Sequence, residues 1–214
     1  MSSSARGLFQ LASSLLLGLG FAANASALTI PLNAEFDNGT TGNFGSVTVT
    51  QNGAALDVSV SLAGSVLGAG SDLHEFYFNL VGSPTNVAIS NTNAPTTAYV
   101  LSTNPPVAGG AGSSFEYGVN LGNGAGGPGN GVLKLATFRI SADQSLDLAM
   151  LGQTSSTAGS GVTVSVAVHV QGTSFVAGST SETVGGVVPE PGTLVLLATG
   201  ITVLARQRRR RALA

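Results

Sequence analysis

The chain has 214 residues, enough for one domain of ordinary size with an adequate hydrophobic core. Charged residues make up only 8% and hydrophobic residues 43%, and cysteine is absent, which excludes a disordered chain, disulfides, thiolate metal sites and cysteine nucleophiles. The formal net charge is −2, and Lys134 and Arg139 are the only basic residues between Arg6 and Arg206, so the acidic middle of the chain is a poor binder of nucleic-acid phosphates.

The first 27 residues show the three parts of a secretory signal peptide. Arg6 supplies the positive start, residues 8–23 form an apolar run, and Ala25-Ser26-Ala27 is a cleavage site of the small-x-small type. This order of charge, apolar run and small residues favours a signal peptide over a buried N-terminal helix. We therefore expect signal peptidase to cut after Ala27 and to leave Leu28 as the mature N-terminus.

Alternating apolar and polar residues predict strands through the region 28–172. Clear strands are expected at 46–50, 56–63, 73–80 and 162–171, and weaker ones at 86–90, 97–102 and 114–121. The run 132–140 is apolar on both faces, which predicts a central strand covered on both sides. Gly/Asn turn signals separate the runs, so we predict an all-β domain, a single β-sandwich of jelly-roll or immunoglobulin-like type.

Two segments of the body depart from the strand pattern. Residues 143–151 are expected to form a helix with Asp143 or Ser145 as its N-cap. Residues 122–127 match G-x-G-x-x-G, but Pro128-Gly129 follows, which cannot open the helix that a dinucleotide site requires. We interpret this second segment as a flexible glycine-rich loop.

The two histidines, His74 and His169, are the first candidates for chemistry. Neither has a second histidine at ligand spacing, so we interpret both as surface or hydrogen-bonded side chains. Asp72 and Glu75 are placed so that they could share a rim with His74. A general base or a metal ligand at His169 would need partners that the sequence does not show.

Acidic residues are sparse in the body, and none forms a recognised catalytic pattern. Asp143 and Asp147 would share one face of the predicted helix, where capping and solubility explain them better than catalysis. The nucleophile elbow G-x-S-x-G and the calcium-loop pattern are both absent from the sequence. We therefore expect no catalytic residue, no metal ligand, no cofactor and a body that is not an enzyme.

The C-terminal part begins with residues 173–187, where Ser, Thr and Gly predominate, and we predict a flexible spacer there. The motif Val188-Pro189-Glu190-Pro191 follows, and its prolines stop any strand from continuing. Residues 193–205 are apolar and uncharged, and as a helix they would span about 20 Å, less than the hydrocarbon core of about 30 Å. The chain then has a basic cluster that would stay on the cytoplasmic side, made of Arg206, Arg208, Arg209, Arg210 and Arg211.

This motif, the short apolar helix and the terminal arginine cluster closely resemble the PEP-CTERM sorting signal of Gram-negative bacteria. The resemblance covers residues 187–211, a segment also catalogued as an ice-binding protein C-terminal domain. It implies recognition and cleavage by an exosortase, a membrane-embedded protease, after the protein has been held transiently in the inner membrane. It also implies a biofilm-forming host that produces exopolysaccharide.

We therefore expect four segments: a signal peptide (1–27), a β-sandwich domain (28–172), a spacer (173–187) and a sorting and membrane segment (188–211). The protein is expected at the cell surface or in the extracellular matrix, with a body that serves as a structural or binding module. Its charge-poor surface, rich in Ser, Thr and Asn, suits neutral sugars such as exopolysaccharide better than nucleic acid.

Two alternatives stay open at this point. A secreted carbohydrate-active enzyme on the same scaffold would need two carboxylates roughly 5–10 Å apart. A permanently anchored adhesion or ice-binding domain would keep its C-terminal segment, and an ice-binding face would need a regular array of threonines. The sequence shows Thr48 and Thr50 but no repeated Thr-x-Thr ladder.

Overall fold

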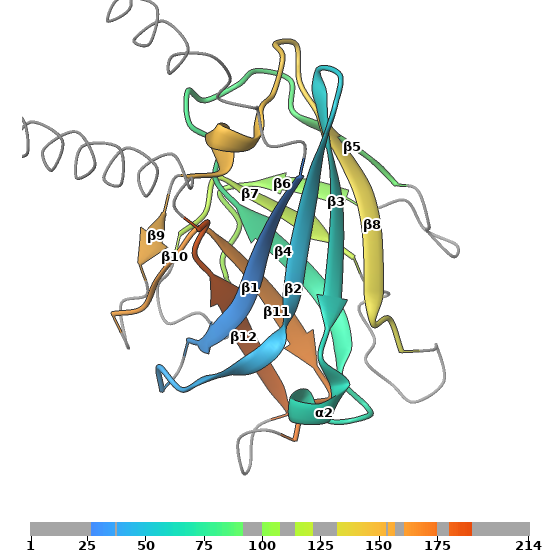
Figure 1. Cartoon of the computed structure of the whole chain (residues 1–214), viewed down its shortest axis with the longest axis vertical. Coiled ribbons are helices and arrows are strands. Elements are labelled where there is room, and N and C mark those ends of the chain that lie inside the picture. The colour runs from blue at the N-terminus through green and yellow to red at the C-terminus, as the bar shows by residue number, and fades with distance from the viewer. Residues whose placement is uncertain are drawn as a thin grey trace, which may run out of the picture. The chain divides into compact units, whose positions relative to one another are not determined.

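The computed structural model describes residues 27–36, 38–91, 100–107, 114–121, 132–152, 154–156, 161–174 and 180–189. These residues are nearly all β-structure, which confirms the predicted all-β class (Figure 1). The strands are β1 (Ala27–Glu35), β2 (Thr41–Asn52), β3 (Ala55–Leu62), β4 (Asp72–Phe78), β5 (Ala88–Asn91), β6 (Val100–Thr103), β7 (Tyr117–Asn120), β8 (Leu135–Ser141), β9 (Ser155–Ser156), β10 (Thr163–Val164), β11 (Val166–Gln171) and β12 (Ser181–Gly186). The helical elements are α2 (Gly64–Leu67) and the 3-10 helix η1 (Leu148–Gly152).

Ten of these strands form one antiparallel sheet instead of the two sheets of the predicted sandwich. Their order is β5-β8-β3-β2-β1-β12-β11-β4-β7-β6, and β9 and β10 make a separate two-stranded ribbon. The sheet curls until its end strands β5 and β6 lie against each other, so that it is nearly barrel-shaped (Figure 1). A curled sheet buries its inner face against itself. A single sheet therefore supplies the hydrophobic core that the sequence predicted between two sheets.

The core lies inside the curl, where the alternation predicted from the sequence is confirmed. Val47 and Val49 on β2, and Val58 and Val60 on β3, are buried and face this interior. The polar residues between them face outward, as a period of two requires. A smaller apolar cluster lies on the outer face of the sheet, at β4 and β11, and is made of Phe36, Tyr77, Phe115, Val164 and Ala167.

The prediction that the run 132–140 is a strand covered on both sides is wrong. Strand β8 lies second from the end of the sheet and buries alternate residues, with Ala136, Phe138 and Ile140 facing the core. Leu135 on its outer face is 48% exposed, and Val132, before the strand, is 51% exposed. The run is therefore apolar in sequence but covered on one side only.

Part of the predicted spacer at 173–187 is a strand instead, because residues 181–186 form β12, while residues 175–179 lie outside the described residues. This strand lies between β1 and β11, near the middle of the sheet. Glycine is needed at its end, since a Cβ on Gly186 would lie only 2.0 Å from the carbonyl oxygen of Pro31. The small residues that suggested a flexible linker instead allow close packing of strands, and the compact unit extends to Pro189.

The predicted helix at 143–151 is reduced to the short 3-10 helix η1. Its cap is Asp147, whose Oδ1 accepts hydrogen bonds from the amides of Ala149 (2.9 Å) and Met150 (3.2 Å). Asp143, one of the two predicted caps, instead accepts a hydrogen bond from Asn86 Nδ2 at 2.5 Å. The two aspartates therefore do not share a helix face, which removes the argument for pairing them.

Both ends of the chain lie outside the described residues. The predicted signal peptide up to Ser26 is among them, and the predicted cut after Ala27 falls at the start of β1. The predicted C-terminal helix also lies there, beyond Pro189. In the part of the chain that the structure describes, no helix is long and apolar enough to cross a membrane.

Candidate functional site

The two histidines, which the sequence left as separate residues, lie side by side on paired strands. His74 is on β4 and His169 on β11, and their ring centroids are 5.7 Å apart with the rings at 69°. The register shifts here, since His169 lies opposite Glu75 while Val170 lies opposite Leu73. His74 is thus the extra residue of a β-bulge, which brings it beside the second imidazole.

Glu75 and Tyr77 complete a polar cluster with the two buried histidines. The Oε2 atom of Glu75 lies 3.8 Å from Nδ1 of His169 and also accepts a hydrogen bond from the Tyr77 hydroxyl. The His169 side chain is 7% exposed and that of Glu75 is 30% exposed. Asp72, which the sequence placed on a shared rim, instead accepts a hydrogen bond from the Leu133 amide at 2.6 Å.

Burial favours the neutral form of His169. Burial lowers its pKa below the ordinary value of 6.5, the Glu75 carboxylate opposes that effect, and His74 adds to the lowering. An imidazole this well buried offers a substrate little access. Among the described residues, no group of three or more His, Cys, Asp or Glu is arranged to hold a metal ion.

Stability is expected to fall as the pH drops from about 7 to about 5, because of His169. Below about pH 6.5 the unfolded chain binds a proton that the folded chain resists, so the free energy of unfolding decreases with falling pH. Urea unfolding midpoints across this range should decline less steeply in His169→Gln, which cannot titrate. An unchanged slope in this variant would show that another group carries the pH dependence.

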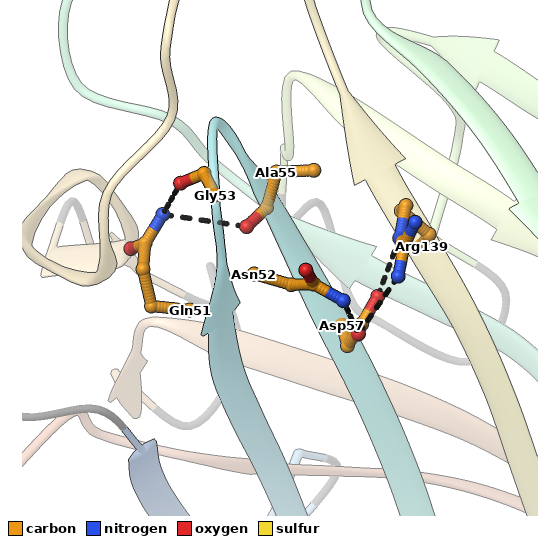
Figure 2. A network of polar contacts seen from close by, with 6 residues as sticks. All are labelled: Gln51, Asn52, Gly53, Ala55, Asp57 and Arg139. Carbon is orange, nitrogen blue, oxygen red and sulfur yellow. Dashed lines mark hydrogen bonds and ion pairs between the residues drawn. The ribbon is translucent and has the colours of Figure 1, made fainter.

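A second polar cluster lies on the outer face of β2, β3 and β8 (Figure 2). Arg139 donates from Nε to Oδ1 of Asp57 at 2.7 Å and from Nη2 to Oδ2 at 3.0 Å, and Asn52 donates to Oδ2 at 2.7 Å. The hydrogen bonds from Arg139 and then Asn52 lower the pKa of Asp57 below 3.8. As a solvent-accessible cross-strand pair, Asp57 and Arg139 contribute little to stability.

The other basic side chain of the described residues, Lys134, is also engaged within the domain. Its Nζ donates to the carbonyl oxygen of Gly68 at 3.1 Å and to the Ser71 hydroxyl. Burial lowers the pKa of Lys134, and the Asp72 carboxylate opposes this. The described part of the domain therefore presents no uncommitted cation to an anionic ligand.

The start of the predicted sorting motif is bonded to the folded domain. Where β12 ends, the chain is bonded to Ser165. The Ser165 amide donates to the Gly186 carbonyl oxygen at 2.8 Å, and the Val188 amide donates to the Ser165 hydroxyl at 3.2 Å. Ser165 is fully buried between β10 and β11, and Val188 packs against the core. Ser165 is not among the predicted site residues, because its only signal in the sequence is a small polar residue inside a run of valines.

The remaining predicted site residues lie outside the described part of the chain. They comprise Ala25 of the cleavage site, Glu190 and Pro191 of the motif, and the cluster Arg206, Arg208, Arg209, Arg210 and Arg211. The evidence for the predicted roles of these residues is therefore their spacing in the sequence.

Comparison with known families identifies this same segment. Residues 187–211 match the PEP-CTERM protein-sorting motif. No curated protein and no solved structure matches the chain. The chain thus carries a PEP-CTERM sorting signal, and this supports export and processing by an exosortase at the membrane before surface localisation.

Proposed function

We propose that this chain is a structural or binding protein of the Gram-negative cell surface or extracellular matrix, with a non-catalytic body that associates with neutral exopolysaccharide. The observation that carries the proposal is the sorting motif at residues 187–211, which follows the last strand of the sheet directly. Signal peptidase would remove residues 1–27, and the exosortase would free the folded body from the inner membrane.

The engagement of the carboxylates supports a non-catalytic body. Glycoside hydrolysis needs two carboxyl groups that face a substrate from either side of the scissile bond. Among the described residues, many carboxylates instead accept hydrogen bonds from donor groups of the domain itself. These are Glu35, Asp57, Asp72, Glu75, Glu116, Asp143 and Asp147.

One face of the sheet supports contact with neutral sugars. Thr29 on β1 lies opposite Thr48 on β2, Thr48 lies opposite Ser59 on β3, and Ser59 lies opposite Thr137 on β8. This row places hydroxyl side chains at the same level on four adjacent strands, facing away from the core. The charges near it, Asp57 and Arg139, neutralise each other. Such a face is better matched to an uncharged, hydroxyl-rich polymer than to phosphates.

Replacing Pro189, Glu190 and Pro191 together with alanine is expected to abolish processing and lower the released protein severalfold. The variant removes the recognition motif but keeps the apolar segment and the arginines that hold the protein in the membrane. Intact mass of the protein from membrane and medium fractions of the host measures this. The wild type should lack residues 1–27 and the C-terminal segment, and the variant should retain residues 193–214.

The exposed Pro106, outside the motif, gives a matched control, because Pro106→Ala also removes a proline. This control should be processed like the wild type. Wild-type protein that keeps residues 193–214 in the membrane fraction would instead make the segment a permanent anchor and defeat the proposal.

A further inference from the structure

The last strand of the domain ends immediately before the sorting motif. Strand β12 pairs with β11 from Ser181 to Gly186 and with β1 at Gly185 and Val184. Strand β12 therefore has a neighbouring strand on each side, and neither of these neighbours is an edge strand of the sheet. Two residues, Val187 and Val188, separate the end of this strand from Pro189.

Ser165 bonds to the chain on both sides of Val187. Its backbone amide holds the carbonyl oxygen of Gly186, and its hydroxyl accepts the amide of Val188. Val187 itself is 48% exposed, so its protection comes from the bonds at its two neighbours and not from burial of its side chain. The Ser165 side chain thus extends the fixed part of the chain by two residues beyond β12.

We infer that Ser165 fixes the start of the sorting segment and that the folded body confines processing to peptide bonds C-terminal to Pro189. Proteolysis requires the substrate chain to open locally from its native hydrogen bonds. The chain up to Val188 is bonded within the domain, so a protease reaches its bonds only when this end of β12 opens. This inference rests on the proposed processing and specifies the N-terminal limit that the folded domain sets on the site of cleavage. Ser165 is here a positioning residue.

Thermolysin, which cuts before large aliphatic residues, tests the protection directly on the purified full chain in detergent. The bond before Val187 fits its specificity, whereas Pro189, in the second position after the cut, excludes the bond before Val188. We expect the wild type to lose its C-terminal segment while keeping Val187 and Val188. Ser165→Ala keeps the backbone bond to Gly186 but loses the acceptor for the Val188 amide. Cleavage before Val187 should therefore appear severalfold faster in this variant.

Ser59→Ala is the matched control, because Ser59 lies on the outer face of β3, away from the chain exit. It should give the wild-type fragment pattern. Thermal unfolding of all three proteins checks that Ser165→Ala remains folded at the digestion temperature. Equal rates of cleavage before Val187 in the wild type and in Ser165→Ala would overturn the role of Ser165.

The C-terminal mass of the protein released by the host provides the second test. A released form that ends at or beyond Pro189 agrees with the inference, and one that ends at or before Val188 overturns it. If the C-terminal segment is never removed, the proposed processing fails. The thermolysin comparison still decides separately whether Ser165 protects this segment.

Discussion

Gly186→Ala is expected to destabilise the domain by more than about 3 kcal/mol, near the upper end for overpacking of a well-packed site. An added Cβ would lie 2.0 Å from the Pro31 carbonyl oxygen and 3.0 Å from Ile30 Cγ2. The first contact is with backbone, which cannot rotate away as a flexible side chain can. The strands β1 and β12 must therefore separate, or the end of β12 must leave the sheet.

Urea unfolding followed by circular dichroism measures this loss. Gly152→Ala is the matched control, because nothing lies within 4 Å of a Cβ built at Gly152. It should shift the free energy of unfolding by less than about 1 kcal/mol, as for most surface substitutions. If the two variants unfold at the same urea concentration, the close approach of β1 and β12 is not a constraint on stability.

This glycine also shows what the sequence could not reveal about the end of the domain. Residues 181–186 read as a linker by composition, since Ser, Thr and Gly are common in flexible segments. Their role depends on Pro31 and Phe36, which are far away in the sequence but contact Gly186 and Gly185. A glycine needed for close packing and one in a loop look alike until the neighbouring strand is known.

The individual strands were easier to predict than their pairing. Alternation identified the segments that became β2, β3 and β4, because each buries one face, and local pattern is enough to show that. The single curled sheet depends on which strands become neighbours. Strands β1 and β12, for example, are the first and last in the sequence but lie side by side in the sheet. No local signal carries this information, so the all-β class is confirmed while the predicted sandwich of two sheets is not.

The histidine cluster has the same explanation. His74 and His169 are separated by most of the domain in sequence, and the bulge at His74 breaks the alternation from which its neighbours were assigned. The sorting segment is different, because its motif, apolar stretch and arginines are contiguous. A signal contained within one short stretch can be identified from sequence alone, and the match at residues 187–211 confirms it.

The interior of the curled sheet is held together by contacts between strands that are not neighbours, and Phe76 is central to them. Its ring lies 5.6 Å from that of Phe78 on the same strand and 5.5 Å from that of Phe138 on β8. Strands β4 and β8 are not adjacent in the sheet, so the second contact crosses the core. Phe76 is fully buried and therefore joins the two walls of the fold.

Phe76→Ala is accordingly expected to lower the free energy of unfolding by about 3–5 kcal/mol, since it removes an aromatic ring and leaves a cavity that the sheet cannot close. Stability of a domain is typically about 5–15 kcal/mol, so this loss should also reduce the yield of exported protein. Val81→Ala, at a position 49% exposed, is the control and should change stability by less than about 0.5 kcal/mol. Urea unfolding of both variants measures the difference. If Phe76→Ala loses no more than Val81→Ala, the packing of β4 against β8 is not what holds the curled sheet closed.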